Sequence, residues 1–129
     1  MYAATLRHAS LSKADLRETQ MQAVYLAHAN LRRADLGEAD LTVAVVFHQA
    51  GLTGANLASA VFCNTIVAAC PNLHQAEGLS QVRHLGPSSL DRDTLRGCVH
   101  WLPDVFLEGI GYTGQEIQTL RAMYPAPSG

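Results

Sequence analysis

The sequence predicts an all-β solenoid: a coil that turns a corner every five residues, closed at its C-terminal end by a small α-helical cap. Two observations predict the coil. A large apolar residue recurs every five positions, and a small residue stands two positions before each one. A third observation, a set of helix-start signals after residue 88, predicts the cap. At 129 residues the chain has the size of one compact domain.

The large apolar residues form an almost unbroken series, which ends in Leu73 as a degraded member. The other positions are Leu6, Leu11, Leu16, Met21, Leu26, Leu31, Leu36, Leu41, Val46, Leu52, Leu57, Phe62 and Val67. Because Val46 and Leu52 are six residues apart, we place a one-residue insertion over 47–51, where Gly51 would relax a bulge. A binding site at that bulge is the alternative interpretation.

A period of five matches neither an α-helix nor a β-strand, and either element would spread the leucines over every face. A coil with four corners places all of them inside. Coils of about twenty residues then stack at ~4.8 Å, and each buries its core only against its neighbours. We therefore expect Leu11, Leu31 and Leu52 to share one inner column.

Asp or Asn often stands between the small and the large residue, as in Ala34-Asp35-Leu36-Gly37-Glu38. This pattern resembles the pentapeptide-repeat family over roughly residues 3–73. The resemblance implies a right-handed quadrilateral β-helix of about three and a half coils. The sequence departs from the pattern at Val24, at the insertion, and at Ala69-Cys70-Pro71.

The repeat fades after residue 73, so we divide the chain into a β-helix over 1–73, a helical cap module over 74–124 and a flexible tail over 125–129. Residues up to 89 are expected to form a loop. Ser89 is expected to cap a helix over about 90–96. Pro103 fits the first position of a second helix, which ends near Gly109. Thr113 and Glu116 form a capping box for a third helix over 114–123.

Residues 89–95, together with residues 102–109, also resemble the tail that follows the coils in some bacterial multidomain pentapeptide proteins, in which a signalling or effector domain can come next. At the other end, the repeat begins almost at Met1, with no capping helix before it. Either a partner covers the first coil, or the chain was cut from a longer one.

Composition argues against several classes of function. The formal charge is −2, and residues 1–73 hold five acidic and five basic side chains, so no nucleic-acid surface is indicated. The odd number of cysteines, Cys63, Cys70 and Cys98, favours reduced thiols in a cytoplasm. The sequence has neither a signal-peptide core nor an apolar run of ~18 residues, so we predict no membrane segment.

Three histidines, His8, His28 and His48, stand twenty residues apart and are predicted to form one outward column. Imidazole is the commonest metal ligand. Stacked parallel rings, however, do not converge on one ion, so we expect neither a metal nor another cofactor.

An apolar stripe is predicted beside the histidines, formed by Tyr25, Val45 and Ile66 with Phe47 close by. Exposed apolar stripes usually mark contact surfaces. We therefore assign partner binding to these four residues and the three histidines. A second copy, another protein or the chain's own C-terminal segment would cover the stripe.

A third face carries two carboxylate columns, Asp15 with Asp35 and Glu18 with Glu38, close to Arg17. Acid–base catalysis needs a cleft that excludes water, which a convex coil lacks. A solvated charged face is the simpler interpretation. The pair Cys98 and His100 has no assignable third group and is expected to belong to the core of the cap.

The sequence thus predicts a non-catalytic protein–protein interaction or scaffold module, with a regulatory or targeting role in a bacterial cytoplasm. Its partner would be a second copy or an effector or signalling protein, with no direct nucleic-acid or membrane contact. The alternative is a DNA mimic that binds a type II topoisomerase, gyrase. A mimic calls for a long acidic rod, whereas this coil is short and electrically balanced.

Overall fold

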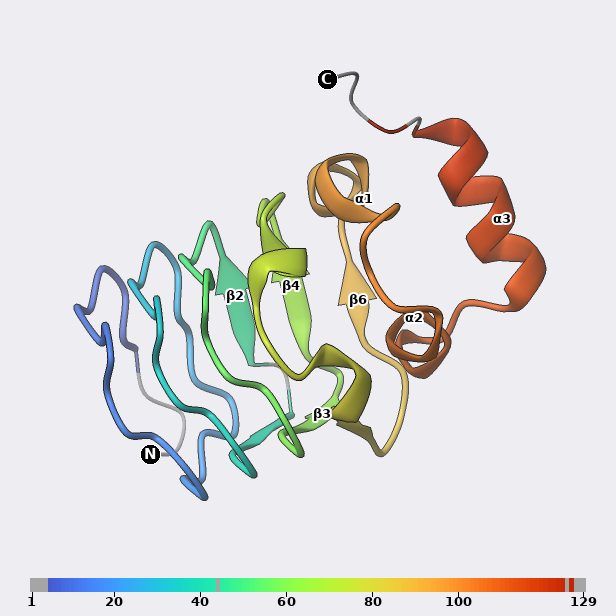
Figure 1. The fold of residues 1–129 in the computed structure, drawn as a ribbon. Coiled ribbons are helices and arrows are strands. Elements are labelled where there is room, and N and C mark those ends of the chain that lie inside the picture. The colour runs from blue at the N-terminus through green and yellow to red at the C-terminus, as the bar shows by residue number, and fades with distance from the viewer. Residues whose placement is uncertain (1–4, 44, 125, 127–129) are drawn as a thin grey trace.

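The computed structural model describes residues 5–43, 45–124 and 126. It has a coil at its N-terminal end and a helical cap at its C-terminal end (Figure 1). Both sheets are parallel, with strand orders β1-β3-β5 and β2-β4-β6. Parallel strands and three α-helices confirm the predicted class of fold. The elements are β1 Asp40–Thr42, β2 Val46–His48, β3 Val61–Cys63, β4 Ile66–Ala68, η1 Leu73–Gln75, η2 Leu79–Gln81, β5 Arg83–His84, β6 Ser89–Leu90, α1 Arg92–Cys98, α2 Asp104–Ile110 and α3 Gly114–Met123.

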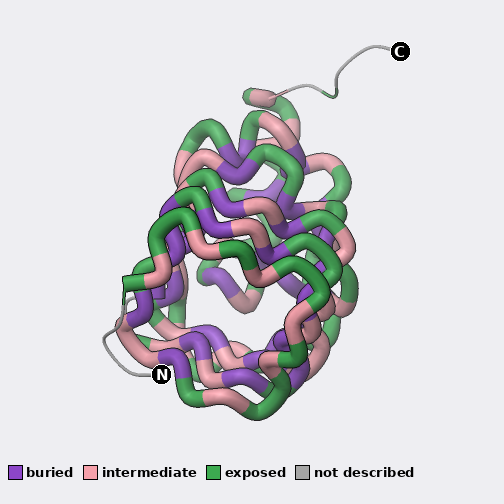
Figure 2. Tube along the Cα trace, turned by 90° about the vertical axis from the view of Figure 1, so that its left-hand side faces the viewer, coloured by how far each residue is buried: buried purple, intermediate pink, exposed green. Residues whose placement is uncertain are grey.

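Four ladders of parallel bridges hold the coils together, one on each side. The ladders start at Thr5, Ser10, Asp15 and Gln20, and in the first step each residue pairs with the one twenty positions later. Viewed toward the N-terminal coils, the chain runs around a closed outline (Figure 2). Backbone N–H groups donate from each coil to the next, for example Leu11 N to Asn30 O at 2.8 Å.

Most corners are tight turns closed by a backbone hydrogen bond, such as the one from Ala14 N to Leu11 O at 3.0 Å. The third residue of this turn, Lys13, has a positive φ of 63°, which resembles a type II turn. The same conformation recurs at a spacing of five, except for one step of six from Val43 to Gln49. The other residues in it are His8, Glu18, Ala23, His28, Arg33, Glu38, Val43, Gln49, Gly54, Ser59, Asn64 and Ala69. The five-residue period is therefore the spacing of corners.

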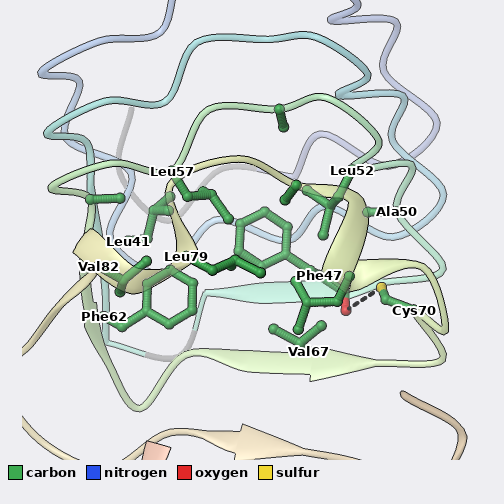
Figure 3. Close-up of a cluster of buried hydrophobic side chains, with 14 of the residues drawn as sticks. Leu41, Phe47, Ala50, Leu52, Leu57, Phe62, Val67, Cys70, Leu79 and Val82 are labelled. Carbon is green, nitrogen blue, oxygen red and sulfur yellow. Dashed lines mark hydrogen bonds between the residues drawn. The ribbon is translucent and has the colours of Figure 1, made fainter. Parts of the chain in front are cut away.

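The large residues of successive coils stack inside the coil (Figure 3). The predicted column of Leu11, Leu31 and Leu52 is confirmed by the pairing of Ser10 with Asn30 and of Asn30 with Gly51. Leu31 and Leu52 are buried, whereas Leu11 is only partly buried because it lies in the first coil.

The insertion lies earlier than predicted. Pairing is offset by twenty residues up to Gln20 with Asp40, and by twenty-one from Tyr25 with Val46 onward. The additional residue therefore falls between Asp40 and Val46, and Phe47 takes the inward position that was assigned to Val46. Ala44, expected to be a small inward residue, lies outside the described residues.

Parallel pairing continues beyond residue 73, the predicted end of the coil. Glu77 pairs with Asn56, β5 pairs with β3, and β6 pairs with β4 as far as Leu90. The segment expected to be a loop thus contributes two 3₁₀ turns and two short edge strands. It lacks the five-residue pattern, which is why its pairing is not evident from the sequence.

Helix α1 is joined to β4 by side chains. Asp91, not the predicted Ser89, is its N-cap, and its carboxylate accepts hydrogen bonds from Thr94 N at 2.9 Å and Ala69 N at 3.0 Å. The buried Thr94 hydroxyl accepts from Cys70 N at 3.0 Å. Pro103 is the N-cap of α2 and not its first helical residue, so the helix begins one residue later than predicted. The capping box of Thr113 and Glu116 at α3 is confirmed.

No helix in the described part of the chain is long and apolar enough to cross a membrane.

Candidate interaction surface

One side of the coil presents an outward column of apolar residues, Tyr25, Val46 and Ile66, which we call the apolar column. They are bridged in order, Tyr25 to Val46 and Val46 to Ile66. Tyr25 is 38% exposed, and the other two are partly buried. Thr5 and Ser89 occupy the two ends of this ladder.

The equivalent ladders on the other three sides are mainly polar. They carry Ser10, Asn30 and Gly51; Asp15, Asp35, Asn56 and Glu77; and Gln20, Asp40, Val61 and Arg83. Apart from Val61, the apolar residues of the four ladders therefore lie on one side of the molecule.

Two residues of the predicted stripe are not on the surface, so that part of the prediction is wrong. Val45 is 0% exposed and Phe47 is 1% exposed. Because the insertion precedes Val46, Val45 fills the small-residue position and Phe47 points into the core. Val46, which was predicted to lie inside the coil, takes the outward position instead. Alternating burial along β2, with Phe47 buried between two partly buried residues, is the pattern that fixes this register.

The histidine column forms only in part. His8 and His28 stack with ring centroids 4.9 Å apart and planes at 8°. His48 meets His28 edge-on at 5.8 Å and 85°. The backbone bond from His28 N to His48 O at 2.8 Å places His48 one residue before the corner, where Gln49 now stands. The shift is the direct consequence of the insertion.

The histidines affect one another electrostatically. Desolvation lowers the pKa of His28, and the neighbouring His8, His48 and Arg7 lower it further. Within the described residues, no three His, Cys, Asp or Glu side chains are grouped so as to hold a metal ion. Because the His8 and His28 rings are stacked in nearly parallel planes, they do not converge on a common point.

Beside the apolar column lies a shallow hollow of about 320 Å³, lined by Val43, Asn64, Ile66 and Ser89. Val43 is 57% exposed and has a φ of 62°. Positive φ is uncommon for a β-branched residue. Val43 stands at the corner just before the insertion, so the hollow and the insertion occupy one region of the surface.

The carboxylate columns line a hollow of about 480 Å³ on the surface of the coil. Arg17 Nε lies 3.1 Å from Asp15 Oδ1 and 3.7 Å from Asp35 Oδ2. The hydrogen bond from Arg17 lowers the pKa of Asp15. Asp35 Oδ1 also accepts from Gly37 N and from Asn56 Nδ2, each at 3.0 Å. Asp15 and Asp35 are thus paired with neighbouring side chains and with the backbone.

The pair Cys98 and His100 is not arranged as nucleophile and base. Cys98 is fully buried, its Sγ donates to Thr94 O at 3.1 Å, and burial raises the pKa of its thiol to about 11. His100 Nε2 instead lies 2.7 Å from Tyr124 O.

Comparison with known proteins identifies the repeats. A family model described as pentapeptide repeats matches residues 1–37 and 19–45, with eight copies. Among solved structures, the chain is similar to HetL, a pentapeptide repeat protein involved in heterocyst differentiation regulation from the cyanobacterium Nostoc sp. strain PCC 7120. That similarity has 31% identity and a TM-score of 0.29 over 59% of this chain, and it spans 35% of HetL. A search of curated proteins finds no match.

Proposed function

We propose that this chain, whose coil carries the repeats of the pentapeptide-repeat family, is a non-catalytic interaction module that binds a protein partner through the apolar column. The family consists mainly of protein-interaction modules. One observation carries the proposal: three consecutive outward positions of one ladder, Tyr25, Val46 and Ile66, are apolar, whereas the other three ladders are mainly polar.

The energetics support a modest association. Full burial of a side chain of this kind contributes ~1.5–3 kcal/mol. Val46 and Ile66 are already partly buried, so most of the available gain comes from Tyr25. Loss of translational and side-chain freedom opposes binding and consumes much of that gain.

Rigidity favours the same surface. Backbone hydrogen bonds connect each coil to its neighbours on both sides, as from Leu26 N to Val46 O at 2.8 Å and from Ile66 N to Val45 O at 2.8 Å. A surface held in this way needs little ordering on binding, which reduces the entropic cost. The partner we expect is a second copy or an effector or signalling protein, in a regulatory or targeting role in a bacterial cytoplasm.

The alternative, a gyrase-binding DNA mimic, has less support. Five acidic and five basic residues in the segment 1–73 give no excess of negative charge. Arg17 also lies within the carboxylate columns that a mimic would present.

The test is a double substitution, Tyr25→Glu with Ile66→Glu, in the full chain. Its matched control adds the same charge to exposed positions on a different side, Ser10→Glu with Thr53→Glu. Light scattering measures self-association, and affinity capture from the source cell followed by mass spectrometry measures other partners. We expect the association to survive in the control and to disappear in the apolar-column variant, with unchanged melting temperatures.

Equal binding by the wild type and the apolar-column variant would contradict the proposal. A gyrase supercoiling assay separates the alternative, because a mimic must alter supercoiling whereas the interaction module must leave it unchanged.

A further inference from the structure

His84 occupies a position that elsewhere in the coil holds an apolar side chain. It pairs with Phe62, which pairs with Leu41, and the ladder of Gln20 and Asp40 places Met21 before them. The inner column therefore runs from Met21 through Leu41 and Phe62 to His84. A leucine would continue this column without any polar atom.

The surroundings of the His84 ring are aromatic. Its centroid lies 5.8 Å from that of Phe62 and 5.5 Å from that of Phe106 in α2, and Phe62 and Phe106 lie 6.0 Å apart. Gly109 of α2 comes so close that a Cβ there would collide with the imidazole. The partly buried ring thus lies between the last coil and the helix that packs on it.

Both ring nitrogens of His84 are buried without a hydrogen-bond partner. A neutral imidazole leaves one N–H donor unpaired in this site, whereas a protonated ring would leave two donors and a charge. Titratable or charged groups on the packed elements are Cys63 on β3, Arg83 on β5, and Asp104 and Glu108 on α2, and none of them bonds the ring. Attraction between a charged ring and the phenylalanines offsets only part of the desolvation cost.

We propose that His84 is a pH-sensitive latch, which holds α2 on the last coil while its ring is neutral and releases it when the ring becomes charged. The proposal is independent of the partner and of the apolar column. Helix α2 lies over the C-terminal end of the coil (Figure 1), and β5 is an edge strand of its sheet. Release would therefore expose a strand edge able to pair with another chain.

The direction of the pH effect follows from burial. Desolvation lowers the pKa of His84 below its ordinary value. The released state therefore binds more protons than the docked state between the two pKa values. Docking is strongest above the ordinary histidine pKa of ~6.5 and weakens as the pH falls from there toward the lower pKa of the docked state.

Amide hydrogen exchange on the full chain, at pH 7.5 and 5.5 and corrected for intrinsic rates, tests the latch. In the wild type we expect α2 to lose protection at the lower pH, by up to about tenfold, because pH 5.5 lies about one unit below the ordinary histidine pKa. In His84→Leu, which has a similar volume and no titrating group, this loss should vanish. His28→Leu, on the exposed histidine column, is the control and should behave as the wild type.

An α2 whose exchange is independent of pH in the wild type would overturn the proposal, as would a His84→Leu variant that keeps the full pH dependence. An NMR titration of the wild type provides a test that needs no variant. The His84 ring should titrate below ~6.5, and titration at or above that pH would also overturn the proposal.

Discussion

Replacing Asp91 with alanine removes the acceptor of two backbone N–H groups, those of Ala69 at the end of β4 and of Thr94 in the first turn of α1. Loss of an N-cap costs ~0.5–2 kcal/mol. Leaving the N–H of Ala69 without its partner adds ~1–3 kcal/mol, toward the lower end because Ala69 is only partly buried. Together, the free energy of unfolding should fall by ~2–4 kcal/mol.

Urea unfolding followed by circular dichroism measures this loss. Asp91→Asn keeps an N-cap acceptor but provides only one oxygen, so it should lose about half as much as Asp91→Ala. Asp93→Ala removes an exposed carboxylate from the same turn and should change the stability by less than ~0.5 kcal/mol. An Asp91→Ala loss no larger than that of Asp93→Ala would refute the assignment of Asp91 as the joint between coil and cap.

The pH dependence gives a second check on Asp91. Burial opposes ionisation of its carboxylate, but the hydrogen bonds from Thr94 and Ala69 outweigh burial and lower its pKa. The stabilisation is therefore present above the unfolded pKa of ~3.9 and is lost as the pH falls through the lower folded value. The stability difference between the wild type and Asp91→Asn should shrink below about pH 4.

Three further substitutions probe the coil, each measured by the same unfolding experiment. Leu36→Ala should cost ~2–5 kcal/mol, because Leu36 is 0% exposed and its removal leaves a cavity in the stack. Gly78→Ala should also destabilise, since Gly78 has a φ of 77° and a Cβ there would lie 2.6 Å from Ala58 N. Val43→Gly should cost less than ~0.5 kcal/mol or stabilise, because relief of the left-handed conformation offsets the entropy of glycine. A loss above ~2 kcal/mol for Val43→Gly, or none for Leu36→Ala, would contradict these expectations.

The five-residue period was sufficient to predict the coil, its corners and most of its core. It could not locate the insertion, because Val46 and Phe47 are both large and apolar, and either satisfies the pattern. The pairing of Tyr25 with Val46 and the burial of Phe47 decide between them. The same shift moved Val45 and Phe47 from the predicted surface to the core. The family match ends at residue 45, within the insertion.

The end of the coil was harder to predict for a different reason. Residues 77–90 pair with the preceding coil through backbone atoms, and backbone pairing requires no particular side chains. His84 continues a column whose earlier members, Leu41 and Phe62, are apolar, and it therefore breaks the pattern in the last coil. The capping box of Thr113 and Glu116, by contrast, is a local device within four residues, and it was predictable for that reason.

The two ends of the coil differ in how their core is covered, and this difference predicts a gradient of local stability. At the cap end, Thr94 accepts from Cys70 N, and Phe106 packs against Phe62, so side chains replace what a further coil would provide. At the other end, the inner leucines of the first coil, such as Leu11, are only partly buried.

A solenoid buries its core only between neighbours, so a coil with one covered side opens more readily than one covered on both. The amides of Leu6, Leu11 and Leu16 donate to the second coil, and those of Leu26, Leu31 and Leu36 donate to the third. Hydrogen exchange should therefore be faster by at least about tenfold in the first set, which corresponds to ~1.4 kcal/mol of local stability. Leu36→Ala should narrow this gap by accelerating exchange in the second set. Equal protection in both sets would mean that the coil opens as one unit, and the nearest-neighbour argument would not hold for this chain.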